Sequence, residues 1–179
     1  MARFCGILAI VALDVAAASI LLRAAEPHER DQKLALSVVE ALKSGDEKLL
    51  PPLVMNVDSY RAMAELTKER VDGEESQRRL QDNADTSLQK AQSGVGRIRK
   101  RAEKDGFDWS SAKVRAVVAM KGERLARDED VLADVFVEIS SDTKTIVVKL
   151  DDCFLRDGAR RIADGMSVVA SLPKPQAAN

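Results

Sequence analysis

The spacing of the apolar residues changes at Gly106, and this change limits the folds that the chain can adopt. Before Gly106 the apolar residues recur at intervals of three and four, which is the period of an amphipathic α-helix. After Gly106 they recur at every second position, which is the period of a half-buried strand. Helices followed by strands are typical of an α+β domain, in which the helices cover one face of an antiparallel sheet.

The first helices are predicted from amphipathic segments and their flanking signals. Residues 29–43 carry apolar side chains on one side, and Ser44-Gly45 supplies the stop signal. Asp46 is expected to cap a short second helix, which Pro51-Pro52 limits because proline lacks a backbone donor.

Two more helix starts are predicted before Gly106. Asp58 or Ser59 is expected to cap a helix that turns Tyr60 inward. Asp72, with Glu75 three residues later, forms a variant of the capping box and is expected to begin another helix.

A narrow apolar stripe follows on one helix face, at Ala84, Leu88, Ala91, Val95, Ile98 and Ala102. Its side chains are mostly small, and Gly94 and Gly96 interrupt it, so we interpret it as packing within the chain's own domain. The alternative is a coiled-coil surface of a helical adaptor. The basic residues from Arg97 to Lys104 suit a solvated helix end, and no nucleic-acid partner is expected because interleaved aromatic residues are missing.

Four strands are predicted after Gly106, over residues 114–120, 131–139, 146–154 and 166–172. The turn signals between them are Lys121-Gly122, Ser140-Ser141-Asp142 and Asp157-Gly158, with Asp164-Gly165 before the last strand. Connections this short favour antiparallel neighbours, because a parallel crossover needs a dozen or more residues.

The N-terminal segment 1–25 predicts an export signal. Arg3 precedes an uncharged apolar run, and small residues at 16–19 offer cleavage sites. Asp14 would cost about 2.5 to 3.5 kcal/mol at the centre of a membrane helix, which weakens the alternative of a permanent anchor. We expect a periplasmic or extracellular protein that meets the membrane only through this segment, with one α+β domain over 26–172 and a disordered tail over 173–179.

Several segments resemble exported bacterial members of the nuclear transport factor two-like (cystatin-like) superfamily. The resemblance rests on Phe107-Asp108-Trp109-Ser110-Ser111-Ala112-Lys113, Ile146-Val147-Val148-Lys149-Leu150-Asp151-Asp152-Cys153, Asp164-Gly165-Met166 and Ala41-Leu42-Lys43-Ser44-Gly45-Asp46. It implies a cone, in which helices are wrapped by a strongly curved four-stranded sheet. Proteins of this family often form homodimers through the sheet. The polar helical segment near 72–105 is an insertion in this scheme. The chain has Gly158-Ala159-Arg160-Arg161 where many members place an aromatic residue, so the packing there is expected to differ.

Asp152 is the candidate catalytic residue, because it interrupts the apolar parity between Leu150 and Phe154. A carboxylate held inside the cone would have a raised pKa, as a general acid or base of an isomerase or dehydratase requires. The simpler interpretation places Asp152 at a strand end, where it binds backbone amides of the turn after Arg156.

Other candidates are aromatic residues that a ligand could contact: Trp109, Tyr60 and Phe154. For Trp109 a core position is the favoured interpretation over a ligand contact, and Cys153 is expected to be a small packed residue rather than a nucleophile. The single histidine, His28, and the lack of metal-binding or nucleotide-binding motifs predict no metal site and no cofactor.

The formal net charge of -1 gives no reason to expect a polyanionic partner. The sequence therefore favours an exported, non-catalytic module of the cell envelope that binds a small ligand or another envelope protein. The alternatives are an enzyme that uses Asp152 and a membrane-tethered helical adaptor.

Overall fold

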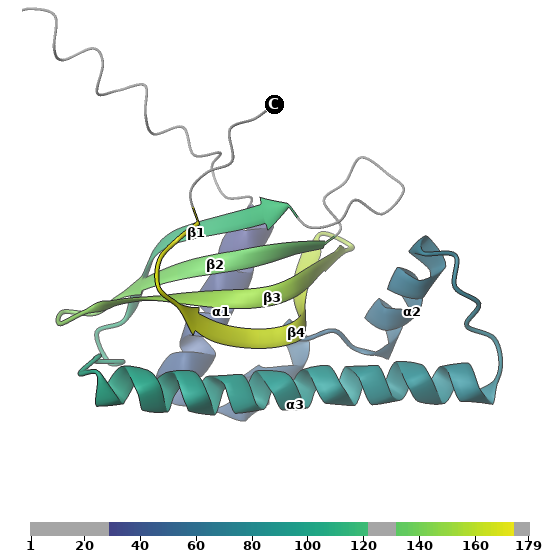
Figure 1. Ribbon diagram of the computed structural model, residues 1–179, viewed down its shortest axis with the longest axis horizontal. Helices are drawn as coiled ribbons and strands as arrows, with labels where there is room; N and C mark the ends of the chain where they lie inside the picture. The colour runs from purple at the N-terminus through teal and green to yellow at the C-terminus, as the bar shows by residue number, and fades with distance from the viewer. Residues whose placement is uncertain (1–28, 122–131, 174–179) are drawn as a thin grey trace, which may run out of the picture. The chain divides into compact units, whose positions relative to one another are not determined.

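The computed structural model describes residues 29–121 and 132–173, and it has helices packed against a four-stranded antiparallel sheet (Figure 1). This confirms the predicted α+β class. The elements in chain order are α1 (Glu29–Ser44), the 3-10 helices η1 (Glu47–Leu49) and η2 (Pro51–Leu53), α2 (Val57–Leu66), α3 (Glu74–Lys104), β1 (Lys113–Lys121), β2 (Leu132–Ser140), β3 (Thr145–Arg156) and β4 (Ala159–Val169). The predicted export signal and the predicted disordered tail beyond Pro173 lie outside the described residues.

The four strands pair in the order β1-β2-β3-β4, each antiparallel to the next. The sheet is not strongly curled, so the strongly curved cone that the family resemblance implied is not present (Figure 1). The helices cover one face of the sheet, and α3 runs along β4.

The last strand begins earlier than the sequence predicted. β4 starts at Ala159, directly after the Asp157-Gly158 turn, and continues through Asp164-Gly165. We predicted a turn at Asp164-Gly165, which is wrong: the register between β3 and β4 shifts there, and Gly165 has a φ of 113°. Glycine with positive φ is common to turns and to strand irregularities, so the residue type alone does not distinguish them.

Two predicted helix caps are also wrong. Asn56, rather than Asp58 or Ser59, caps α2, because its Oδ1 accepts a hydrogen bond from the Ser59 amide at 2.9 Å. α3 begins at Glu74 after Gly73, without a side-chain cap, and Asp72 instead pairs with Arg70. The Asp46 cap is confirmed, since its Oδ1 accepts from the Lys48 amide at 3.0 Å.

The main core lies between the helices and the sheet. Most of the apolar stripe of α3 is buried in it, at Ala91, Val95, Ile98 and Ala102, while Leu88 packs against it half-buried. This burial agrees with packing inside the chain's own domain. The core residues with no exposed surface include Val38, Leu42, Leu50, Val135, Val137, Val148, Leu150 and Ile162. A smaller cluster lies at the other end of α3, where Tyr60 of α2, Leu80 of α3 and Phe154 of β3 meet.

A buried ion pair joins the start of α1 to β4. Arg160 Nε donates to Asp31 Oδ1 at 2.6 Å, and the two side chains are 1% and 0% exposed. Arg160 Nη1 also donates to the Cys153 carbonyl on β3 at 3.0 Å. The guanidinium of Arg160 therefore occupies buried space at the start of β4.

We predict that Asp31→Ala lowers the free energy of unfolding by about 3 kcal/mol, because it removes a fully buried carboxylate that accepts a hydrogen bond from the buried Arg160 guanidinium. The double variant Asp31→Leu with Arg160→Met should recover much of this loss. Urea unfolding followed by circular dichroism measures both. The control is Asp72→Ala, which breaks the exposed pair with Arg70 and should change little. Equal effects of Asp31→Ala and Asp72→Ala would contradict this account.

Candidate functional site

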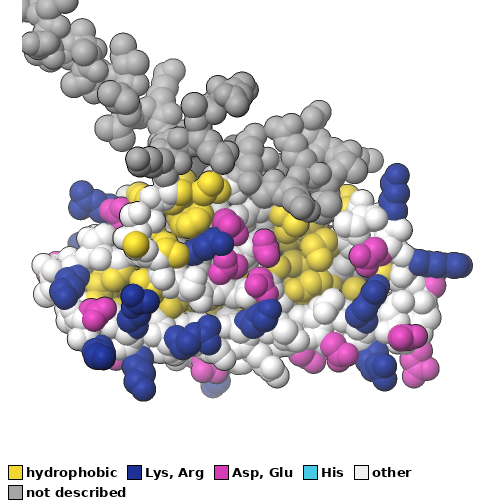
Figure 2. All heavy atoms as spheres, in the orientation of Figure 1, with side chains coloured by type: hydrophobic (Ala, Val, Ile, Leu, Met, Phe, Trp, Pro, Cys, Tyr) yellow, Lys and Arg dark blue, Asp and Glu magenta, His cyan; other side chains and the backbone are white. Residues whose placement is uncertain are grey.

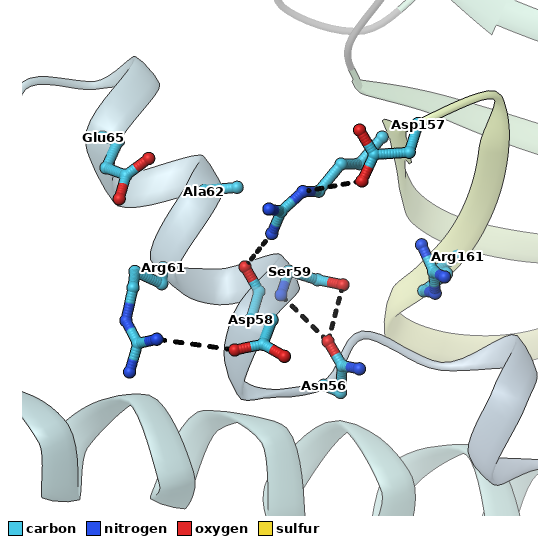
Figure 3. Close-up of a pocket in the computed structure, with 9 residues that line it drawn as sticks. Asn56, Asp58, Ser59, Arg61, Ala62, Glu65, Asp157 and Arg161 are labelled. Atoms are coloured by element: carbon cyan, nitrogen blue, oxygen red, sulfur yellow. Dashed lines mark hydrogen bonds and ion pairs between the residues drawn. The ribbon is translucent and has the colours of Figure 1, made fainter.

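A polar hollow lies between α2 and the turn that joins β3 to β4, and we call it the α2 hollow (Figure 3). Its volume is about 290 Å³. It is lined by Asn56, Asp58, Ser59, Arg61, Ala62, Glu65, Arg156, Asp157 and Arg161. Six of these nine side chains carry a formal charge, so the hollow suits a polar ligand.

Local hydrogen bonds fix both walls of the α2 hollow. On the helix side, Asn56 Oδ1 accepts from both the amide and the hydroxyl of Ser59, each at 2.9 Å. On the sheet side, the turn after β3 has positive φ at Asp157 and Gly158. Arg156 connects the two walls, since its Nη1 donates to the Asp58 carbonyl while its Nε pairs with Asp157 Oδ2 at 3.2 Å.

Two of the three arginines in the α2 hollow already have acidic partners. Arg156 pairs with Asp157, and Arg61 pairs with Asp58 at 3.5 Å and donates to Gln77 Oε1 at 2.7 Å. Arg161 of β4 and Glu65 of α2 form no ion pair with any residue in 29–121 or 132–173. Figure 3 shows these two side chains on opposite sides of the hollow.

Asp152 is not inside the core. Strand β3 has an irregularity between Asp151 and Cys153, where Asp152 is exposed and has a φ of 49°. The extra residue shifts the inward parity, so that Cys153 joins Leu150 in the core. The Asp152 carboxylate forms no hydrogen bond with the turn after Arg156, which the simpler interpretation had predicted. The hydrogen bond of Asp152 comes from its backbone amide, which donates to Asp134 Oδ1 at 3.1 Å.

The surroundings of Asp152 are nevertheless rich in charge. Partial burial raises the pKa of the Asp152 carboxyl above its ordinary value of 3.8. The carboxylates of Asp134, Asp164 and Asp151 raise this pKa further. Lys149 offsets part of that repulsion, and its Nζ lies 2.9 Å from Asp134 Oδ2 and 2.5 Å from Asp151 Oδ1. These two hydrogen-bonded carboxylates raise the pKa of the Lys149 ammonium.

Burial and the charge of Asp164 raise the pKa of the Tyr60 phenol, and the charge of Asp152 is a minor further cause. The Tyr60 hydroxyl shares a hydrogen bond of 2.5 Å with Ser87 Oγ and donates to the Ala163 carbonyl at 3.3 Å. The group is therefore a neutral, hydrogen-bonded phenol at pH 7.

Trp109 and Phe154 are packed in the interior. The Trp109 ring meets Phe107 edge to face, with 4.7 Å between the ring centroids, and Phe154 is 1% exposed. None of the three aromatic candidates lines the α2 hollow. Their assignment as ligand contacts stays a prediction.

Cys153 has the environment of a structural residue. It is fully buried, and its Sγ lies 3.5 Å from the Leu150 carbonyl. Burial raises the pKa of the thiol, which removes the thiolate that nucleophilic chemistry needs. This agrees with the interpretation of Cys153 as a packed residue.

The sheet face opposite α1 is partly apolar. Phe136 lies on it, with Lys149 Nζ 6.0 Å from the ring centroid. Figure 2 shows hydrophobic side chains on this face in patches, with basic and acidic side chains between them. A second hollow, of about 710 Å³, lies between α1 and the start of β1 and includes Leu36, whose side chain is 60% exposed.

No protein-family model, curated protein or solved structure matches the chain. The fold alone therefore defines the class, which is α+β with helices on one side of an antiparallel sheet. Within residues 29–121 and 132–173, no helix is both long and apolar enough to cross a bilayer. The same part of the chain contains no cluster of His, Cys, Asp or Glu side chains suited to a metal ion.

We predict that Asp152→Asn raises the melting temperature at pH 7. The folded-state pKa of Asp152 is raised, so its ionised form is less favourable in the folded protein than in the unfolded chain. This penalty is fully present above the folded-state pKa and disappears below the ordinary value of 3.8, so the gain should vanish at pH 3. Thermal unfolding of both proteins at the two pH values measures it.

Asp152→Gly serves as the comparison, because glycine also removes the strain of a positive φ, about 1 kcal/mol, at either pH. It should therefore remain stabilising at pH 3. A lower melting temperature for Asp152→Asn at pH 7 would show that the carboxylate has a stabilising partner, contrary to this account.

Proposed function

We propose that the protein is an exported, non-catalytic module of the cell envelope that binds a small polar ligand in the α2 hollow. The observation that carries this proposal is the charged lining of the α2 hollow, six of nine residues, compared with three of the eight that line the larger hollow beside α1. The space between helices and sheet is filled by side chains such as Leu42, Val135 and Leu150, which have no exposed surface. The α2 hollow, in contrast, is open, charged and held by hydrogen bonds from both of its walls.

Export is supported by the sequence of residues 1–25, with its basic start, apolar run and small residues. A small ligand, rather than a protein, is favoured at the α2 hollow because of its size and because its charged groups converge from two elements. Contact with an envelope protein or with a second copy of the chain remains a proposal for the sheet face that carries Phe136.

The second candidate function is acid–base catalysis by Asp152. Its raised pKa, among the carboxylates of Asp134, Asp164 and Asp151, favours it. Asp152 does not line the α2 hollow, so an enzyme would bind its substrate elsewhere. The two candidate functions therefore predict that activity or binding is lost on substitution of different residues.

The test is a thermal-shift screen of the full chain against small polar compounds: carboxylic acids, amines, amino acids and phosphate esters. We expect at least one compound to raise the melting temperature in a concentration-dependent way, since a ligand at 100 times its Kd adds about 2.7 kcal/mol. Ala62→Trp fills the α2 hollow and should abolish the shift. Thr86→Trp, at an exposed position of α3, is the matched control and should leave it unchanged.

The bound compound should be recovered chemically unchanged, and Asp152→Asn should not alter its affinity. Loss of binding in Asp152→Asn together with turnover of the compound would favour the enzyme. A screen without any shift, or a shift that survives Ala62→Trp, would contradict the proposed function.

A further inference from the structure

The α2 hollow has two charges left over after its internal ion pairs are counted. Three arginines and three acidic residues line it, and the pairs Arg61 with Asp58 and Arg156 with Asp157 neutralise four of these six groups. The remaining cation is Arg161, and the remaining anion is Glu65. Neither forms an ion pair with any residue that the structure describes.

The two remaining groups come from different elements and face the same space. Arg161 is carried by β4 and Glu65 by the last turns of α2, and they lie on opposite sides of the hollow (Figure 3). They form no ion pair with each other. Both are attached to regular elements, which keep binding groups in place better than loops do.

A ligand with two opposite charges would satisfy both groups at once. A guanidinium binds a carboxylate through two parallel hydrogen bonds, and a carboxylate accepts charge-assisted hydrogen bonds from an ammonium group. A purely anionic ligand would gain at Arg161 but would meet repulsion from Glu65. A purely cationic ligand would be attracted by Glu65 but repelled by Arg161.

We infer that the α2 hollow binds a small zwitterion of the amino-acid or dipeptide class, with its carboxylate on Arg161 and its ammonium on Glu65. This inference rests on the proposed function and specifies the chemistry of its ligand. The ion pairs of Arg61 with Asp58 and of Arg156 with Asp157 then form polar walls that fix the position of the ligand.

The test uses isothermal titration calorimetry on the full chain with three probes: L-alanyl-L-alanine, its N-acetyl derivative and its C-terminal amide. The N-acetyl derivative lacks the ammonium, and the amide lacks the carboxylate. We expect the zwitterion to bind about tenfold or more tightly than either derivative, as one charge-assisted contact is worth that much.

Two charge-removing variants assign the contacts. Arg161→Gln should weaken the zwitterion but not the amide, so that these two probes bind alike. Glu65→Gln should abolish the preference for the zwitterion over the N-acetyl derivative. Both residues lie outside the buried core, and circular dichroism of each variant confirms that it is folded.

Equal affinities of the three probes for the unmodified chain would overturn the inference, and so would a preference that persists in both variants. The outcome for the proposed function is read separately. If another polar compound binds and Ala62→Trp blocks it while the dipeptide does not bind, the zwitterion inference fails and the proposed function stands. If Ala62→Trp blocks no compound, both fail.

Discussion

The rest of the structure depends on how closely α3 approaches β4. A methyl group on Gly94 would lie 2.6 Å from Met166 Cγ and 3.1 Å from the Met166 carbonyl oxygen, so only glycine fits there. A methyl group on Gly165 of β4 would likewise lie 3.3 Å from Lys90 Cβ. This close contact brings the apolar stripe of α3 onto the sheet and fills the space that a cone would leave for a ligand. The α2 hollow lies outside this filled core, at the side of the sheet.

The sequence predicted the fold class because the two apolar periods are long and distinct. The packing of the α3 stripe within the domain could also be predicted, because its small side chains suit a close contact better than a coiled coil. The details at element ends could not be predicted. Asp164-Gly165 has the residue types of a turn, yet β4 continues through it and Gly165 lies opposite Asp151. Asn56, Asp58 and Ser59 are all of residue types that cap helices, so residue type alone does not show that α2 begins after Asn56.

The candidate site was harder to predict than the fold. Asp152 looked internal because alternation was extended through β3. One residue more in β3 than in the facing part of β2 breaks this alternation, and Asp152 is exposed. The charged residues of the α2 hollow resemble ordinary solvated side chains in the sequence, and only the tertiary structure shows which of them already have partners. The two adjacent arginines after Gly158-Ala159 have different surroundings, since Arg160 is buried and Arg161 lines the hollow.

The most direct test of this account compares alanine at two glycines on the same helix. Gly94→Ala places a methyl group against Met166 and should destabilise the protein by about 1 to 3 kcal/mol, as overpacking does. Gly96→Ala has no neighbour within 4 Å and should stabilise it by up to about 1 kcal/mol through helix propensity. Urea unfolding of both variants measures the difference. If the two substitutions stabilise the protein equally, α3 does not lie closely on β4 and the account is contradicted.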